Sequence, residues 1–422
     1  MKNFLRFFKN FTQEITDLDP ESKKVTFYLF LTYFFVLFSY PLVRSSTGAI
    51  FYEVYSSEQY SLATFIGVLA LMGMISFNNK LQAKLGVHKL FVFTGFLTIL
   101  MLMGSYSMLL EGTKEMAFVL FATKEAYIVL LVHTTLAFAN AFYPLGLFKK
   151  LIGPIGAAGS LGGIIGGQLT TYLAKSSDFG TEYVFYLALV FIFITVVIFY
   201  QTHNVDVKGL GTNKSITPLK TIRGVKKYVG LIAAIVALSQ FVIFIADLQF
   251  NLIFEQVVTE KNARTAYLGN FYSLINLVSL VLQLIILPYV LIKISLRSIF
   301  LFIPLLYLIL VIGGLGFGAS QLVVVGFVFI AMKGTDYSVF AVVKEVMYHP
   351  LLSLQKFGAK YITDMFVYRL SKATIAFIFA QLAITEIPHI MKYLSVVQFV
   401  FLALWVLLIV KLFQEQKKLN HS

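Results

Sequence analysis

Long apolar segments recur along this chain and are separated by shorter polar stretches. A run of about 17–25 predominantly apolar residues is long enough to cross a bilayer as an α-helix. The pattern predicts twelve such helices, at residues 25–43, 61–78, 89–110, 120–142, 153–174, 183–201, 228–248, 267–291, 297–318, 320–341, 361–384 and 393–412. Lys124 and Glu125 interrupt the fourth of these segments, and Lys333 and Asp336 interrupt the tenth.

The composition indicates the same class of protein. Of the 422 residues, 59% are hydrophobic and 13% are charged, whereas a soluble domain has about 25% charged residues. We therefore expect a polytopic membrane protein surrounded by the lipid bilayer. The chain has no cysteine, which excludes disulfides, a thiolate nucleophile and a cysteine-ligated zinc site. The first 24 residues are mixed and charged, unlike a cleavable signal peptide.

The formal net charge of +14 is concentrated in alternate loops. Lysine and arginine are frequent in both tails and in the even-numbered loops, whereas the odd-numbered loops are acidic, mixed or nearly uncharged. By the positive-inside rule, both termini are expected in the cytoplasm of a protein of the bacterial inner membrane. Because topology explains the basic residues, we expect no nucleic-acid partner.

The sixth loop, residues 202–227, is the longest and most polar loop. It divides the chain into an N-terminal bundle of six helices, residues 1–201, and a C-terminal bundle of six, residues 228–422. The predicted fold class is thus an all-α membrane protein with twelve transmembrane helices in two six-helix bundles. This is the plan of a secondary transporter built from parallel repeats.

Four cations stand within or beside the apolar segments and are candidates for binding an anionic substrate: Arg44, Lys344, Arg369 and Lys372. A charge at mid-bilayer costs about 2.5–3.5 kcal/mol on insertion scales, so such charges usually face a polar cavity. Arg369 and Lys372 share one helix face, and Asp364 could partly offset them. The alternative for Arg44 is an arginine that snorkels to the membrane interface, and for Lys344 a position at the membrane edge.

Four acids are candidates for gating or coupling: Glu125, Asp247, Asp336 and Glu345. Asp247 could form a salt bridge with a basic residue of the other half or hold a coupling ion, because an acid in an apolar run requires a partner. The alternative for Glu125 is a water-exposed position at the start of the fourth helix. The alternative for Asp336 is a structural ion pair with Lys333, three residues earlier on the same face.

Signatures of catalysis are absent from the sequence. It contains no His-Glu-x-x-His motif and no nucleophile elbow, so we expect no enzymatic activity, catalytic residue, metal site or cofactor. The glycine-rich stretch at residues 153–167 lacks the Gly-Lys-Ser/Thr ending of a phosphate-binding loop. Small residues at four-residue spacing are instead typical of closely packed transmembrane helices.

Four segments together resemble the ATP/ADP translocases of obligate intracellular bacteria and plastids, a nucleotide transporter family distantly like the major facilitator superfamily. Residues 344–351, Lys-Glu-Val-Met-Tyr-His-Pro-Leu, are similar to the family's Lys-Glu-Met-Ala-Tyr-Ile-Pro-Leu. The other segments are Phe-Ser-Tyr-Pro-Leu-Val-Arg-Ser at residues 38–45, Lys-Glu-Ala at 124–126 with Phe-Ala-Asn and Phe-Tyr-Pro-Leu at 138–145, and residues 358–372, which end in Arg-Leu-Ser-Lys. The resemblance places Glu125 and Lys372 on positions that the family uses in transport.

The resemblance implies a major-facilitator-like fold and nucleotide exchange of the ATP/ADP type by a protein that works as a monomer. The family has an Asp and a Lys after the arginine of the first helix, where this chain has Ser45 and Ser46. Without that lysine, a less charged nucleotide or another phosphorylated metabolite is also a candidate substrate. Two other classes stay open: a proton-coupled symporter or exporter of another solute, and a membrane scaffold or receptor without transport activity.

Overall fold

The computed structural model describes residues 18–204, 218–286, 293–318, 321–382 and 387–421. Several predicted features therefore lie outside the described residues, in whole or in part. They are most of the N-terminal tail, the centre of the predicted linker at 205–217, and the predicted helix ends at 287–291, 320 and 383–384. Everywhere else, each of the twelve predicted segments is helical, and the described residues contain no strand.

The first half contains five helical elements that provide six spans. They are α2 (Pro20–Val54), α3 (Ser57–Leu110), α4 (Met116–Phe142), α5 (Leu145–Lys175) and α6 (Thr181–Tyr200). The long α3 contains the second and third predicted helices, joined by a kink at Gly86, where φ is 73°. A residue with a side chain rarely adopts this left-handed backbone conformation, so the glycine permits the bend. The predicted second loop is therefore a kink between two helical spans.

The second half begins after the short helix α7 (Pro218–Thr221) and supplies the other six spans. Four spans are formed by α8 (Lys226–Val257), α9 (Lys261–Val281) with η1 (Leu282–Ile286), α11 (Leu296–Phe317) and α16 (Ile390–His421). The tenth consists of α12 (Leu322–Thr335), η2 (Asp336–Phe340) and α13 (Ala341–Met347), and the eleventh of α14 (Ser353–Lys360), η3 (Tyr361–Val367) and α15 (Tyr368–Ala380). In both of these, a π-helical segment interrupts the α-helix, a feature frequent at functional sites.

The predicted helix ends were wrong at three candidate residues. Arg44 lies well inside α2, Glu125 lies in the third turn of α4, and Asp247 lies ten residues before the end of α8. The charges break the apolar pattern but not the helix, because the backbone hydrogen bonds continue past a polar side chain. The water-exposed start proposed for Glu125 is thus excluded, as is a place for Arg44 at the end of its helix.

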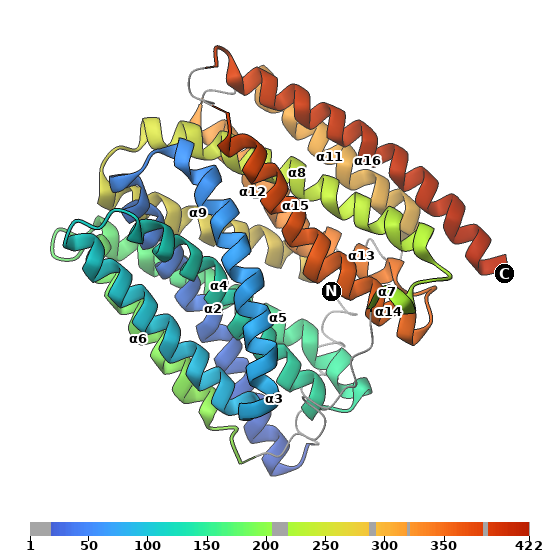
Figure 1. Ribbon diagram of the computed structural model, residues 1–422, viewed down its shortest axis with the longest axis horizontal. Coiled ribbons are helices and arrows are strands. Elements are labelled where there is room, and N and C mark those ends of the chain that lie inside the picture. The colour runs from blue at the N-terminus through green and yellow to red at the C-terminus, as the bar shows by residue number, and fades with distance from the viewer. Residues whose placement is uncertain (1–17, 205–217, 287–292, 319–320, 383–386, 422) are drawn as a thin grey trace.

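The two halves pack against each other through α5 with α9 and through α3 with α15. Figure 1 shows the first half in blue to green and the second in yellow to red. A Cβ atom on Gly167 of α5 would lie 2.6 Å from the carbonyl oxygen of Gly269 on α9. A Cβ atom on Gly162 or Gly166 would come closer still to a backbone carbonyl oxygen of α2, that of Phe34 or Phe38 respectively. The glycine-rich stretch therefore serves close helix packing, as its spacing predicts.

Ten helices of the described chain are long and apolar enough to cross a membrane by length and composition. The two remaining predicted spans are α5, which is rich in glycine, and the segment from α14 to α15. The latter contains Asp364, Arg369 and Lys372. Its low hydropathy thus arises from charged residues that, as described next, face a cavity.

Candidate functional site

A cavity of about 630 Å³ lies between the two halves. It extends from the middle of the molecule toward the end that has the even-numbered loops, since it is lined by residues such as Tyr33 on α2, Gly156 on α5 and Gln283 in η1. Its charged lining residues are Arg44, Glu125, Asp247, Lys333, Lys344, Asp364, Arg369 and Lys372. All four predicted substrate-binding cations are therefore brought together in one cavity.

One ion pair in the cavity crosses from one half to the other. Lys372 on α15 lies 3.8 Å from the carboxylate of Glu125 on α4. Lys124 lies 4.0 Å from another oxygen of the same carboxylate, and its ammonium is 3.6 Å from the ring centroid of Phe121. Lys372 is thus neutralised by Glu125 and not by Asp364, the acid that the sequence offered as a partial offset. Its partner comes from a helix distant in sequence.

A second ion pair lies within the C-terminal half. Lys344 on α13 donates to Asp364 in η3 over 2.7 Å, and the Tyr348 hydroxyl lies 3.1 Å from the same oxygen. The position of Asp364 in the sequence predicts that it offsets Arg369. In the structure it offsets Lys344 instead. The neighbouring Glu345 pairs with Lys360, has an exposed side chain and does not line the cavity, so the structure separates it from the other gating candidates.

Lys333 and Asp336 form an ion pair of 3.6 Å on one helix face. The Lys333 ammonium also lies 4.7 Å from the ring centroid of Tyr337. Lys333 lines the cavity, whereas Asp336 is buried behind it in η2. The pair neutralises itself, and only its cationic member contacts the space in which a substrate could bind.

Two cavity cations have no acidic partner within 4.0 Å among the described residues: Arg44 and Arg369. The Arg44 guanidinium lies 4.1 Å from the ring centroid of Tyr272 and 5.6 Å from that of Tyr40, and its buried Nε atom has no hydrogen-bond partner. The Arg369 guanidinium donates a hydrogen bond of 3.4 Å to the Met365 carbonyl oxygen of its own helical segment. The two arginines come from opposite halves and are available to bind an anion.

Asp247 is held by hydrogen bonds, and no described cation lies within ion-pair distance of it. The Tyr60 hydroxyl on α3 donates to one carboxylate oxygen over 2.8 Å, and the Asn251 amide donates to the other over 3.0 Å. The Tyr52 hydroxyl on α2 in turn donates to Asn251 over 2.7 Å. In place of a salt bridge to the other half, Asp247 is thus bonded directly to Tyr60 of that half and is connected to Tyr52 through Asn251.

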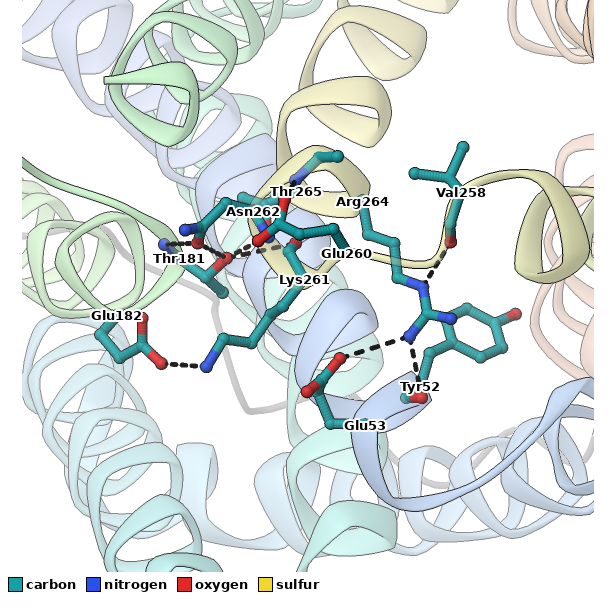
Figure 2. Close-up of polar contacts among 11 residues, drawn as sticks. Tyr52, Glu53, Thr181, Glu182, Val258, Glu260, Lys261, Asn262, Arg264 and Thr265 are labelled. Carbon is teal, nitrogen blue, oxygen red and sulfur yellow. Dashed lines mark hydrogen bonds and ion pairs between the residues drawn. The ribbon is translucent and has the colours of Figure 1, made fainter. Parts of the chain in front are cut away.

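The opposite end of the molecule is closed by polar contacts between the halves, and Figure 2 shows them. We call this the outer end, because it has the odd-numbered loops, which the positive-inside rule predicts to lie outside the cytoplasm. Arg264 on α9 donates over 2.9 Å to the carbonyl oxygen of Tyr52 and pairs over 3.4 Å with Glu53, both on α2. Its Nε atom donates over 2.7 Å to the carbonyl oxygen of Val258 in its own half.

Further contacts extend this closure to α6. The Asn262 side-chain oxygen accepts from the Thr181 amide over 2.8 Å, and the Thr181 hydroxyl lies 2.7 Å from that of Thr265. Lys261 forms an ion pair with Glu182. We use the term outer closure for the contacts of Arg264 and Asn262 with α2 and α6. The sequence did not predict the outer closure, because Arg264 and Asn262 resemble the polar residues that commonly lie in a loop before a helix.

No family model matches this sequence, and no curated protein matches it. Solved structures show the fold. The nucleoside transporter NupG covers 94% of this chain and 99% of its own at a TM-score of 0.65 and 11% identity. The match to a D-xylose-proton symporter covers 92% of this chain and 96% of the symporter, with a TM-score of 0.65 and 12% sequence identity. A bacterial homologue of the iron transporter ferroportin also matches in two states. Its inward-facing structure covers 92% of this chain and 98% of the homologue, with a TM-score of 0.65 and 15% identity. Its outward-facing structure covers 92% of this chain and 99% of the homologue, with a TM-score of 0.60 and 16% identity.

These similarities establish a twelve-helix fold of the major facilitator type over nearly the whole chain. At these identities the comparisons identify the fold alone. The substrate therefore has to be inferred from the side chains that line the cavity.

Proposed function

We propose that this protein is a secondary transporter of an organic anion, with nucleotides as the favoured class. The observation that carries the proposal is the pair Arg44 and Arg369, two cavity cations from opposite halves without a described acidic partner. A guanidinium can bind phosphate oxygens by two parallel hydrogen bonds. Transport then proceeds by rocking of the two halves about a site between them.

The two cavity lysines can also take part in substrate binding. Lys372 and Lys344 are held by Glu125 and Asp364, and a phosphate group can replace either carboxylate as their partner. Because the pair of Lys372 and Glu125 joins the halves, replacing it changes the contacts between them. Glu125 therefore has a gating role in this proposal, which extends to exchange of nucleotides by a monomer in the bacterial inner membrane.

Exchange is tested in proteoliposomes. Vesicles are preloaded with unlabelled AMP, ADP and ATP or left empty, and uptake of the labelled nucleotides is followed. We expect uptake that depends on the internal nucleotides. Absence of uptake into both kinds of vesicle, with inserted and folded protein, contradicts nucleotide transport and favours a scaffold or receptor that retained only the fold.

Lys372→Gln tests the site itself. We expect the variant to lose nucleotide uptake, because the amide provides no charge for phosphate and leaves Glu125 without its cross-half partner. The matched control is Lys227→Gln, which breaks an exposed ion pair with Glu415 away from the cavity and should transport normally. Unchanged uptake by folded Lys372→Gln removes this lysine from the site.

A second candidate, proton-coupled transport, is favoured by one observation. Asp247 lines the cavity, and its carboxylate accepts hydrogen bonds from Tyr60 and Asn251 without a cation within ion-pair distance among the described residues. A carboxylate in this setting can bind and release a proton. This mechanism predicts uptake into empty vesicles that is driven by an inward proton gradient and stopped by an uncoupler, and loss of that dependence in Asp247→Asn.

A further inference from the structure

The charges around the cavity leave an excess of two positive charges. Five cationic side chains line it, Arg44, Lys333, Lys344, Arg369 and Lys372, against the three carboxylates of Glu125, Asp247 and Asp364. Adding the buried partners Lys124 and Asp336 adds one charge of each sign. The excess is therefore two by either count. Lys124 and Lys372 share the carboxylate of Glu125, and Asp247, which has no cation within ion-pair distance among the described residues, balances the second of these lysines, so the two arginines account for the excess.

Closure of the cavity around a substrate gives this excess an energetic meaning. In a rocking transporter, the loaded site must pass through a state that is closed to water at both ends. Charges without partners are costly in such a state, because desolvation of an ion costs several kcal/mol that only a close counter-charge offsets. A substrate with two negative charges leaves the closed cavity neutral.

Resting on the proposed function, we propose that the preferred substrate carries two negative charges, as a phosphomonoester does, and that it is a nucleoside monophosphate. A phosphomonoester has a charge of about −1.5 to −2 at pH 7. Nucleoside di- and triphosphates have more negative charge than Arg44 and Arg369 neutralise. They have to displace a carboxylate from Lys344 or Lys372 and leave that carboxylate unpaired.

The rest of the cavity favours a nucleoside as the body of this substrate. Tyrosine side chains from both halves line it: Tyr33, Tyr40, Tyr272, Tyr337 and Tyr368. Stacking of a base on an aromatic ring contributes about 1–3 kcal/mol and needs no particular base. Asn276 and Gln283 add amide groups to the lining, which can hydrogen-bond to a base edge. A sugar phosphate or inorganic phosphate uses the two arginines but not the aromatic rings.

The test is an exchange experiment in proteoliposomes loaded with labelled AMP, in which release of the label is measured after one external compound is added. The buffer contains no magnesium, so that the charges of the nucleotides are not altered. External AMP should drive release of label at least about tenfold faster than ADP, ATP, adenosine, ribose 5-phosphate or phosphate at equal concentration. Faster exchange with ADP or ATP overturns the two-charge assignment but leaves nucleotide transport standing. Equal exchange with ribose 5-phosphate overturns the nucleoside assignment. No exchange with any nucleotide contradicts the proposed function itself.

Charge variants make the inference specific to this cavity. Asp364→Asn frees Lys344 and raises the excess to three, so the ratio of ADP to AMP exchange should rise about tenfold. Arg369→Gln lowers the excess to one, so the same ratio should fall. The double variant Lys344→Gln with Asp364→Asn restores the excess of two and should return the ratio toward that of the unmodified protein. A ratio that does not follow the charge in the folded variants overturns the proposal.

Discussion

Arg264 provides the sharpest test of how the outer end is closed. Its side chain is 8% exposed, and two of its contacts cross to the other half: the hydrogen bond to the Tyr52 carbonyl oxygen and the ion pair with Glu53. Its bond to Val258 stays within one half, so that bond survives when the halves separate. Of the hydrogen bonds and ion pairs of Arg264, only the two that cross between the halves favour the closed state, and they act beside the contacts of Asn262 with α6.

The size of this bias follows from the two contacts. A hydrogen bond from a charged donor contributes about 1.5–3 kcal/mol. The ion pair with Glu53, whose side chain is 44% exposed, contributes about 0–1 kcal/mol. Together they favour closure by about 1.5–4 kcal/mol, so Arg264→Ala should raise the population open at the outer end about 10- to 700-fold.

Thiol labelling measures that population directly, because the chain has no cysteine of its own. Ser61 is a suitable reporter position on α3. It shares a helix face with the cavity residues Val68 and Leu71, and its buried hydroxyl has no hydrogen-bond partner. A cysteine there is closed off in this state and becomes accessible when the outer end opens.

We expect a polar thiol reagent to label Ser61→Cys about 10- to 700-fold faster when Arg264→Ala is added. Glu53→Gln, which removes only the half-exposed ion pair, should accelerate labelling about fivefold or less. Lys227→Ala, which breaks a distant exposed ion pair within one half, is the matched control and should leave the rate unchanged. An unchanged rate in folded Arg264→Ala refutes the assignment of Arg264 to the closure.

Three further outcomes are expected. Gly166→Ala should lower the thermal stability of the detergent-solubilised protein by an overpacking cost of about 1–3 kcal/mol, because the new Cβ overlaps the α2 backbone, whereas Gly104→Ala, with no atom within 4 Å, should not. Gly86→Ala should also lower thermal stability, by about 1–2 kcal/mol, since φ is 73° there; an unchanged melting temperature contradicts this. Tyr52→Phe, which removes the hydrogen bond to Asn251, should weaken the effect of a bound substrate on Ser61→Cys labelling, and a substrate effect of full size argues against that link.

The helices could be predicted because each span is an apolar run long enough to cross a bilayer. The ends of a helix could not be predicted where one of its charged residues faces the cavity. Arg44, Glu125 and Asp247 interrupt the hydropathy pattern while their helices continue. A pattern of hydropathy registers only that a residue is polar. It cannot separate a side chain that faces an internal cavity from one that marks the end of a helix.

The types of residue in the site could be predicted, but their pairing could not. Charge inside apolar sequence identified Arg44, Lys344, Arg369 and Lys372, and all four line the cavity. Their partners depend on which helices adjoin in space, and α4 meets α15 only once the two halves assemble. For the same reason, nothing in the sequence near Arg264 indicated its contacts with α2.

A chain of hydrogen bonds through Tyr52 connects the site with the outer closure, and this gives a physical route from substrate binding to opening. The Tyr52 hydroxyl donates to Asn251, whose amide donates to Asp247 at the cavity wall. The carbonyl oxygen of the same Tyr52 accepts from Arg264 at the outer end. A substrate anion near Asp247 is repelled by its carboxylate and competes for nearby donors. A shift of Asp247 therefore acts on both Tyr60 and Tyr52, which belong to the other half. Since the contacts on each side are few and directional, weakening those at the cavity removes part of the support for those at the outer end.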